Sequence, residues 1–165
     1  DRGHTWQHLI NGFTDNDTHD LVFIKRGAGR RIFCATEAGM HYSDYEAERW
    51  HYLHIPEAPW LSFRSVKTRS DNIGVIFASV ADKPSGETGI LLMSRDHGES
   101  WQKASLPDDV NSTLWSIGTN PADPMLVYVV SIFGQIFRSI NGGETWQKLP
   151  RELGEIRMVA WTPSA

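Results

Sequence analysis

The sequence lacks several features that mark common protein classes. Cys34 is the only cysteine, so no disulfide can form within the chain. No apolar run approaches the roughly 18 residues of a membrane-spanning helix, and no signal peptide is present. We therefore expect a soluble protein without disulfides. The absence of an initiator methionine indicates a processed or trimmed piece, and the compartment stays open.

The chain also lacks a basic excess and a helical pattern. Twenty acidic residues outnumber 16 basic ones, and the net charge is -4. This balance argues against nucleic acid or an anionic membrane surface as a partner. No window of about eleven residues or more places its apolar residues at the helical period. We therefore expect an all-β fold.

What the chain does contain is a repeated motif, Ser-x-Asp-x-Gly-x-Ser/Thr-Trp, which we call the box. It occupies residues 94–101 and 139–146, and residues 1–6 carry a third copy without the opening Ser-x. Residues 43–50 keep only the serine and the tryptophan, with Tyr45, Ala47 and Arg49 at the other positions. The residues that we assign to the boxes are Asp1, Gly3, Thr5, Trp6, Ser43, Trp50, Ser94, Asp96, Gly98, Ser100, Trp101, Ser139, Asn141, Gly143, Thr145 and Trp146.

The residue types of the box predict a structural turn. Asp96 can accept hydrogen bonds from backbone N–H groups within its own turn, and Gly98 permits a positive φ. Trp101 supplies a large apolar body that packs beneath the turn. An exposed aspartate could instead be a metal ligand or a catalytic acid, but one active site does not need three or four copies. We therefore predict no metal site and no cofactor at the boxes.

The spacing of the boxes is typical of a β-propeller. The box tryptophans fall at positions 6, 50, 101 and 146, at spacings of 44, 51 and 45 residues. A repeat of about 40 to 50 residues with strand patterning codes for one four-stranded blade. Predicted inner strands are residues 21–25, 63–67, 114–118 and 156–160, and predicted second strands are residues 31–36, 75–80 and 126–131. A polar insertion at 82–89 accounts for the longest spacing.

These strands divide the chain into blades. The predicted units are an outer strand of a preceding blade (1–18), three blades (19–58, 59–108 and 109–151) and an inner strand of a following blade (152–165). Three blades leave an open wedge with apolar faces, whereas propellers close with four to eight blades. We therefore expect a companion half, either a second copy of this chain or the other part of a nicked or truncated protein.

The boxes at 94–101 and 139–146 resemble those of Asp-box proteins, also called BNR-repeat proteins. This resemblance covers nearly the whole chain as repeats and implies a β-propeller. The collection includes sialidases, oligoxyloglucan-type and related glycoside hydrolases, sortilin-like receptors and photosystem assembly factors. Fold alone does not choose among these functions.

The candidate binding site lies at the inner strands, because propellers bind ligands at the central channel. Aligning the blades places Val22, Arg64, Trp115 and Arg157 at equivalent positions, preceded by Asp20, Ser62, Thr113 and Glu155. Arg64 and Arg157 could bind a carboxylate, with Trp115 as a stacking surface for a sugar or an anionic small molecule. His19 is a further candidate. The alternative is that the arginines pair with neighbouring blades and that Trp115 is core.

Two functions remain open after these assignments. The first is a ligand-binding or assembly scaffold with its ligand at the channel or top face. The second is a glycoside hydrolase or lyase-like enzyme completed by the missing blades, with Asp20 and Glu155 as the candidate acids. A sialidase would need a third arginine beside Arg64 and Arg157, and no inner strand supplies it. Seven histidines form no compact metal signature.

Overall fold

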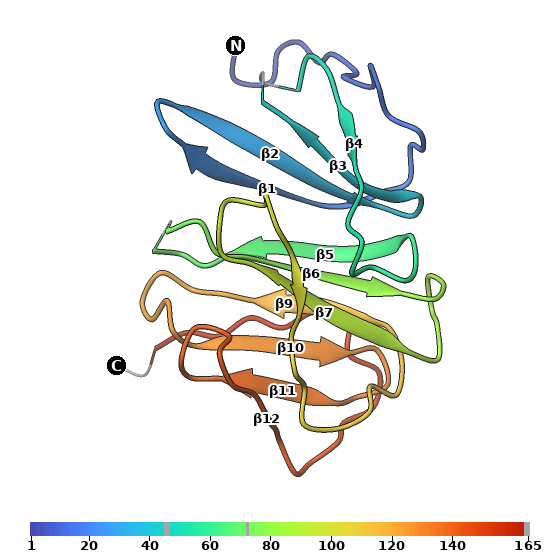
Figure 1. The fold of residues 1–165 in the computed structure, drawn as a ribbon, viewed down its shortest axis with the longest axis vertical. Coiled ribbons are helices and arrows are strands. Elements are labelled where there is room, and N and C mark those ends of the chain that lie inside the picture. Colours follow the sequence, from blue (N-terminus) through green and yellow to red (C-terminus); the bar gives the residue numbers. More distant parts are fainter. Residues whose placement is uncertain (45–46, 72, 164–165) are drawn as a thin grey trace.

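The computed structural model describes residues 1–44, 47–71 and 73–163, and these residues form three four-stranded sheets and no helix (Figure 1). The first sheet contains β1 (Thr18–Arg26), β2 (Gly29–Thr36), β3 (Gly39–Ser43) and β4 (His51–Leu53). The second contains β5 (Ser62–Thr68), β6 (Ile76–Ala81), β7 (Gly89–Ser94) and β8 (Gln102–Lys103). The third contains β9 (Leu114–Gly118), β10 (Val127–Ser131), β11 (Ile136–Ser139) and β12 (Gln147–Lys148).

Each sheet is an up-and-down meander, the arrangement of a propeller blade. Consecutive strands pair antiparallel in all three sheets. β5 contacts both β1 and β9, so the first strand of each blade is its inner strand. The blades lie side by side along the molecule, from the first blade beside the N-terminal segment to the third blade beside the C-terminal segment (Figure 1). The chain therefore has the predicted all-β propeller architecture.

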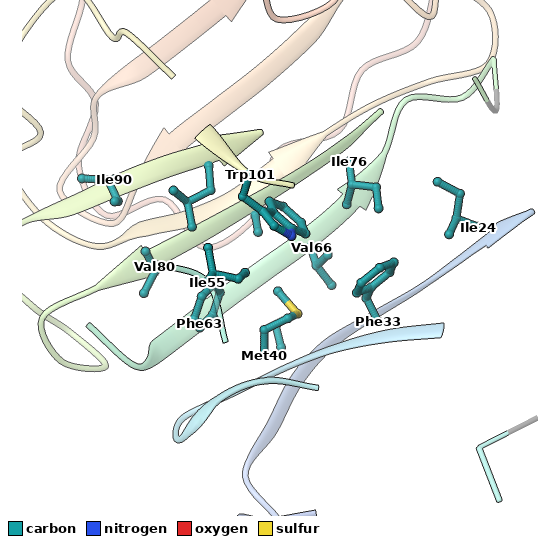
Figure 2. Close-up of a cluster of buried hydrophobic side chains, with 13 residues drawn as sticks. Ile24, Phe33, Met40, Ile55, Phe63, Val66, Ile76, Val80, Ile90 and Trp101 are labelled. Atoms are coloured by element: carbon teal, nitrogen blue, oxygen red, sulfur yellow. The ribbon is translucent and has the colours of Figure 1, made fainter. Parts of the chain in front are cut away.

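The second strands explain why the blades pack on both faces. β2 buries all six residues from Arg31 to Thr36, and β6 is buried along its whole length. Strands covered on both faces read as continuous apolar runs rather than as alternating ones. Figure 2 shows the resulting core between the first two blades, with Phe33 and Met40 facing Phe63 and Val66. A second core fills the space between the second and third blades.

Hydrogen bonds within the box at 94–101 close its turn. Asp96 accepts from the backbone N–H of Ser100 at 2.9 Å and from its hydroxyl at 2.5 Å. Ser94 Oγ accepts from the Gly98 N–H at 2.9 Å, and the indole N–H of Trp101 donates to the Gly98 carbonyl at 3.2 Å. The box at 139–146 repeats the three bonds from backbone and indole N–H groups, while its fourth bond is reversed: the Asn141 amide donates to the Thr145 hydroxyl at 2.8 Å. The box is thus a locally hydrogen-bonded turn.

The boxes at 94–101 and 139–146 also pack against the second strand of the preceding blade. Trp101 meets Phe33 edge to face, with ring centroids 6.2 Å apart, and Trp146 meets Phe77 in the same way at 6.2 Å. A Cβ on Gly98 would lie 2.3 Å from Phe33, so only glycine fits the contact, and its φ of +85° also favours glycine. The box therefore links neighbouring blades as well as closing a turn.

The two atypical boxes differ in what lies beside them. Trp50 is buried and packs on Phe13 of the N-terminal segment, with ring centroids 4.5 Å apart. Ala47 takes the glycine position there with a φ of +65°. In the box at 1–6 the turn is formed, yet Trp6 is 90% exposed. Tyr45 of the box at 43–50 lies outside the described residues.

Most of the predicted strands form, while the two flanking ones do not. The insertion at 82–88 connects β6 and β7 as predicted. The predicted outer strand in 1–18 and the inner strand at 156–160 have no strand pairing in the described chain. A strand requires a ladder partner, and among the described residues neither segment has another strand of its own blade to pair with. Their assignment to neighbouring blades stays a prediction.

Trp101→Ala should lower the free energy of unfolding by about 3–5 kcal/mol, because the buried indole leaves a cavity between two blades. Urea unfolding followed by circular dichroism measures this. The matched control is Leu61→Ala, since Leu61 is 54% exposed, and we expect a change within about 0.5 kcal/mol. Equal effects of the two substitutions would contradict the role of the box in joining blades.

Asp96→Asn tests the charge of the box. Burial alone would raise the pKa of Asp96, but the hydrogen bonds from Ser100 and Ser94 outweigh it and lower the pKa. The carboxylate therefore stabilises the folded state above its unfolded pKa, and this contribution is lost as pH falls through the folded pKa. We expect wild type to exceed the variant by about 1 kcal/mol at neutral pH, and the difference should shrink below about pH 4.

Urea unfolding at several pH values measures this difference. Asn141→Asp is the mirror control, since it places a carboxylate in the equivalent turn and should add acid-side pH dependence. A difference that stays constant from neutral to acidic pH would contradict the assignment.

Candidate functional site at the inner-strand rim

A bulge near the start of each inner strand sets the candidate site. The pairing register of β1 shifts between Thr18 and Asp20, which leaves His19 without an opposite residue in β2. The same shift leaves Arg64 unpaired in β5 and Trp115 unpaired in β9. Bulges re-aim side chains and recur next to binding sites. His19, Arg64 and Trp115 are therefore equivalent positions.

This register corrects the alignment of the first blade. The sequence alignment makes Val22 the equivalent of Arg64. In the structure Val22 lies three residues beyond the bulge and pairs with Phe33. The error arises because the apolar run of β1 begins at Leu21, two residues after the bulge, whereas Phe63 and Leu114 directly precede the bulges of β5 and β9. His19, predicted separately as a ligand-binding residue, takes the place given to Val22.

Arg157 takes the corresponding place in the C-terminal segment. The Val159 N–H donates to Ser116 Oγ at 3.3 Å, as the Val66 N–H donates to Asp20 Oδ2 at 3.0 Å. Ser116 and Asp20 are both the first residues after a bulge. Arg157 lies two residues before Val159, and Arg64 lies two residues before Val66. Arg157 is therefore at the position equivalent to Arg64.

The two predicted arginines meet on the predicted aromatic residue. The Arg64 Cζ lies 3.7 Å from the centroid of the Trp115 ring, and the Arg157 Cζ lies 4.6 Å from it. Cation–π contacts of this kind contribute about 0.5–2 kcal/mol each. Strands β5 and β9 and the C-terminal segment thus bring these three side chains together, as the alignment of the inner strands required.

Burial and like charge act on Arg64. Burial lowers the pKa of its guanidinium, the charge of Arg157 lowers it further, and Asp17, Glu37 and Asp20 partly offset both effects. An arginine stays charged despite such a shift. Within residues 1–44, 47–71 and 73–163, the guanidinium of Arg64 forms no hydrogen bond or ion pair. Its donors are therefore available to a ligand.

The side chain of His19 is only 6% exposed and is linked to the second blade. Its Nδ1 lies 2.6 Å from the Phe63 carbonyl, which can only accept, so this nitrogen carries the proton. Its Nε2 faces Asp17 at 3.5 Å and Glu37 at 4.0 Å. Glu37 also accepts from the Ser62 hydroxyl at 2.8 Å. His19 is held in place by these contacts and positions the carboxylates around it.

We call this set the inner-strand rim: Asp17, His19, Glu37, Arg64, Trp115 and Arg157. The start of β1 pairs with the end of β2, whereas the box serine at 43 pairs with the beginning of β2. The rim and the boxes therefore lie at opposite ends of the blades. Sequence reasoning missed Asp17 and Glu37. Antiparallel pairing supplied a usable signal, since Glu37 follows directly after β2 and so returns to the start of β1.

Asp20, predicted as a candidate acid, joins the first two blades. Its carboxylate accepts from Ser65 Oγ at 2.9 Å, from the Val66 N–H at 3.0 Å and from Lys67 Nζ at 2.6 Å. These donors all belong to β5. The carboxylate thus has its acceptor positions occupied by the neighbouring blade.

Glu155, the second candidate acid, is exposed and forms an ion pair with Arg157. In the described parts of the chain the two candidate acids share no contact. Glu155 acts on the rim only through Arg157, whose charge it faces.

Other features of the chain bear on metal binding, membrane association and reactivity. The described residues 1–44, 47–71 and 73–163 hold no group of three or more His, Cys, Asp and Glu side chains placed for a metal ion. Over the same ranges, no helix is long and apolar enough to cross a membrane. Cys34 is buried as predicted, and burial raises the pKa of its thiol to about 11. A groove of about 860 Å³ beside β7 and β8 is lined by Trp60, Leu106 and Val110 and contains no predicted site residue.

Asp20→Asn should lower the free energy of unfolding by about 1–3 kcal/mol, because Lys67 would lose its counter-charge and an amide nitrogen would face backbone and hydroxyl donors. Thermal and urea unfolding measure this. Glu155→Gln is the control, since the exposed ion pair contributes little and we expect a change within about 0.5 kcal/mol. If Asp20→Asn leaves the free energy of unfolding unchanged, the wild-type carboxylate is not needed to join the blades and remains a candidate acid.

Comparisons with known proteins agree with this fold. No protein-family model matches the sequence, and no curated protein sequence matches it. A GH74 enzyme from Niastella koreensis superposes with a TM-score of 0.68 at 19% identity, over 88% of this chain and 25% of that one. YCF48 from Cyanidioschyzon merolae gives 0.57 at 18% identity, over 82% and 38%. A structure of YCF48 bound to D1 peptide gives 0.60 at 16% identity, over 88% and 48%. The chain spans a quarter to a half of these proteins, which are β-propellers, and it has the same fold.

Proposed function

We propose that this chain belongs to a β-propeller scaffold that binds a carboxylate-bearing ligand at the inner-strand rim. The observation that carries the proposal is the pair of guanidiniums over Trp115, one of which has its hydrogen-bond donors unused. Arginine forks recognise carboxylates with two parallel hydrogen bonds. The aromatic ring adds a stacking surface for an apolar or planar part of the ligand.

An acidic peptide segment is the ligand class that we favour. One structural neighbour, YCF48, is described in complex with a D1 peptide, which shows that this fold can present a peptide-binding surface. Asp17 and Glu37 limit the ligand in a second way, because a carboxylate placed close to them would be repelled. The ligand's negative charge must therefore lie toward Arg64 and Arg157.

The second candidate is a glycoside hydrolase or lyase-like enzyme whose site is completed by other blades, including those of a companion half. Similarity to the GH74 enzyme favours it. A retaining or inverting mechanism needs two carboxyl groups across a cleft. The Asp20 carboxylate binds donors of β5 and the Glu155 carboxylate pairs with Arg157, so the two predicted acids do not form a free pair. We therefore rank this candidate below the scaffold, and a carbohydrate ligand ranks with it.

The test measures binding of a fluorescein-labelled acidic peptide by anisotropy, beside the same peptide with glutamine in place of glutamate. Arg64→Ala should weaken binding of the acidic peptide about tenfold, because one bidentate contact is lost. Arg95→Ala is the matched control: Arg95 is an exposed arginine at the opposite, box end and pairs with Glu144. It should leave the affinity unchanged.

Three results would overturn the scaffold proposal. These are equal affinity for the acidic and neutral peptides, an equal loss in both arginine variants, or no binding at all. Hydrolysis of xyloglucan oligosaccharides that Glu155→Gln abolishes would support the enzyme instead.

A further inference from the structure

The acidic side of the inner-strand rim consists of Asp17 and Glu37, which the carboxylate of the proposed ligand must avoid. The Asp17 side chain is 66% exposed and the Glu37 side chain 30% exposed, so both can be reached from solution. Within residues 1–44, 47–71 and 73–163, neither carboxylate pairs with a lysine or an arginine. Neighbouring carboxylates without a counter-charge repel each other, so this side of the rim favours a cation.

His19 adds a third acceptor between these carboxylates. The Phe63 carbonyl lies 2.6 Å from Nδ1 and can only accept, so Nδ1 carries the proton and Nε2 of the neutral ring has a lone pair. Nε2 faces Asp17 Oδ1 at 3.5 Å and Glu37 Oε2 at 4.0 Å, which are acceptors as well. The histidine side chain is only 6% exposed, and a buried acceptor that lacks a donor is unfavourable.

Three acceptors that face one another match the donors of an ammonium group. An ammonium carries three N–H donors and no acceptor. The described residues hold no group of histidine and acidic side chains placed for a metal ion, which leaves an organic cation. A lysine ammonium is a compact charge with rotatable donors, whereas an arginine guanidinium is a planar fork suited to a single carboxylate. The acceptor set therefore favours lysine.

The basic side of the rim lies directly beside this acceptor set. Ser62 donates its hydroxyl to Glu37 at 2.8 Å. The next residue, Phe63, accepts from His19, and Arg64 follows it in β5. The charge of Glu37 also acts on Arg64. Two residues along a strand span roughly 6–7 Å, so an anionic and a cationic group of one ligand can bind side by side here.

We propose that the acidic peptide bound at the rim carries a lysine two residues from its acidic residue, with the lysine ammonium between His19, Asp17 and Glu37. Side chains two residues apart lie on the same face of an extended peptide, roughly 6–7 Å from each other, and this matches the spacing of the two sides of the rim. The inference rests on the proposed function, because the carboxylate of the same peptide contacts Arg64 and Arg157.

The test compares two fluorescein-labelled peptides of identical composition and net charge by anisotropy. One has Glu-x-Lys at its centre, and in the other the same lysine is moved to the far end of the peptide. Measurements are made at about pH 8, where an unperturbed histidine is neutral. The Glu-x-Lys peptide should bind about tenfold more tightly, because its ammonium gains hydrogen bonds to charged acceptors. Equal affinities of the two peptides would overturn the inference.

Substitutions of the carboxylates identify where the lysine binds. Asp17→Asn together with Glu37→Gln should remove the tenfold preference for the Glu-x-Lys peptide, and the glutamine keeps an oxygen for the Ser62 hydroxyl. Glu48→Gln is the matched control, since Glu48 is an exposed glutamate in the box at 43–50, and the preference should remain. Thermal unfolding checks that the variants fold. A preference that survives in the double variant, or that Glu48→Gln removes, would count against the lysine site.

This inference and the proposed function fail in different ways. Arg64→Ala should weaken both peptides about tenfold while leaving the ratio of their affinities unchanged. If wild type binds both peptides equally and Arg64→Ala weakens both, the carboxylate site stands and the lysine site is wrong. If neither peptide binds, or Arg64→Ala weakens neither, the proposed function is wrong and the inference falls with it.

Discussion

The contact between a box and the phenylalanine of the preceding blade holds the rest of the structure in place. The box turn is closed by its own hydrogen bonds, so the tryptophan leaves it in a fixed direction. Glycine at the contact lets the turn approach the Phe33 or Phe77 ring more closely than a Cβ would allow. The angle between blades follows from this approach, and that angle brings the inner strands together. A rim assembled from three segments therefore depends on a contact at the opposite end of the blades.

The fold could be predicted from the sequence because the box is a local pattern. The candidate site could be predicted only in part because it depends on pairing between distant strands. The box is a pattern of residues within eight positions, so its turn and its period could be predicted without tertiary information. The meeting of Arg64, Trp115 and Arg157 could be predicted because equivalent blade positions converge on one axis. The place of His19 could not, because the apolar run of β1 begins after its bulge, whereas the apolar runs of β5 and β9 begin before theirs. The three donors from β5 that bind Asp20 lie 45 to 47 residues further along the chain, and no local sequence feature indicates them.

The polar residues at and beside the inner-strand rim are of two kinds. Some join neighbouring blades, and others form no hydrogen bond or ion pair within the described residues. Asp20 and His19 lie in the first blade and bond to β5, so their polar groups stabilise the packing of two blades. Arg64 is partly buried, yet no acid neutralises it by direct contact in the described residues. Burying a charge without a partner is unfavourable, and the Trp115 face repays only part of that cost. This is why we place the proposed ligand at Arg64 rather than at Asp20.

A repeat architecture stabilises each blade through its neighbours, and the terminal surfaces show what that requires. The first blade buries Trp50 against Phe13 from the N-terminal segment, which substitutes for a blade on that side. The C-terminal segment lies against β9 and against the loop that follows β10, and Ile140 remains exposed. On both outer blades, irregular segments thus pack where a neighbouring blade lies elsewhere in the array.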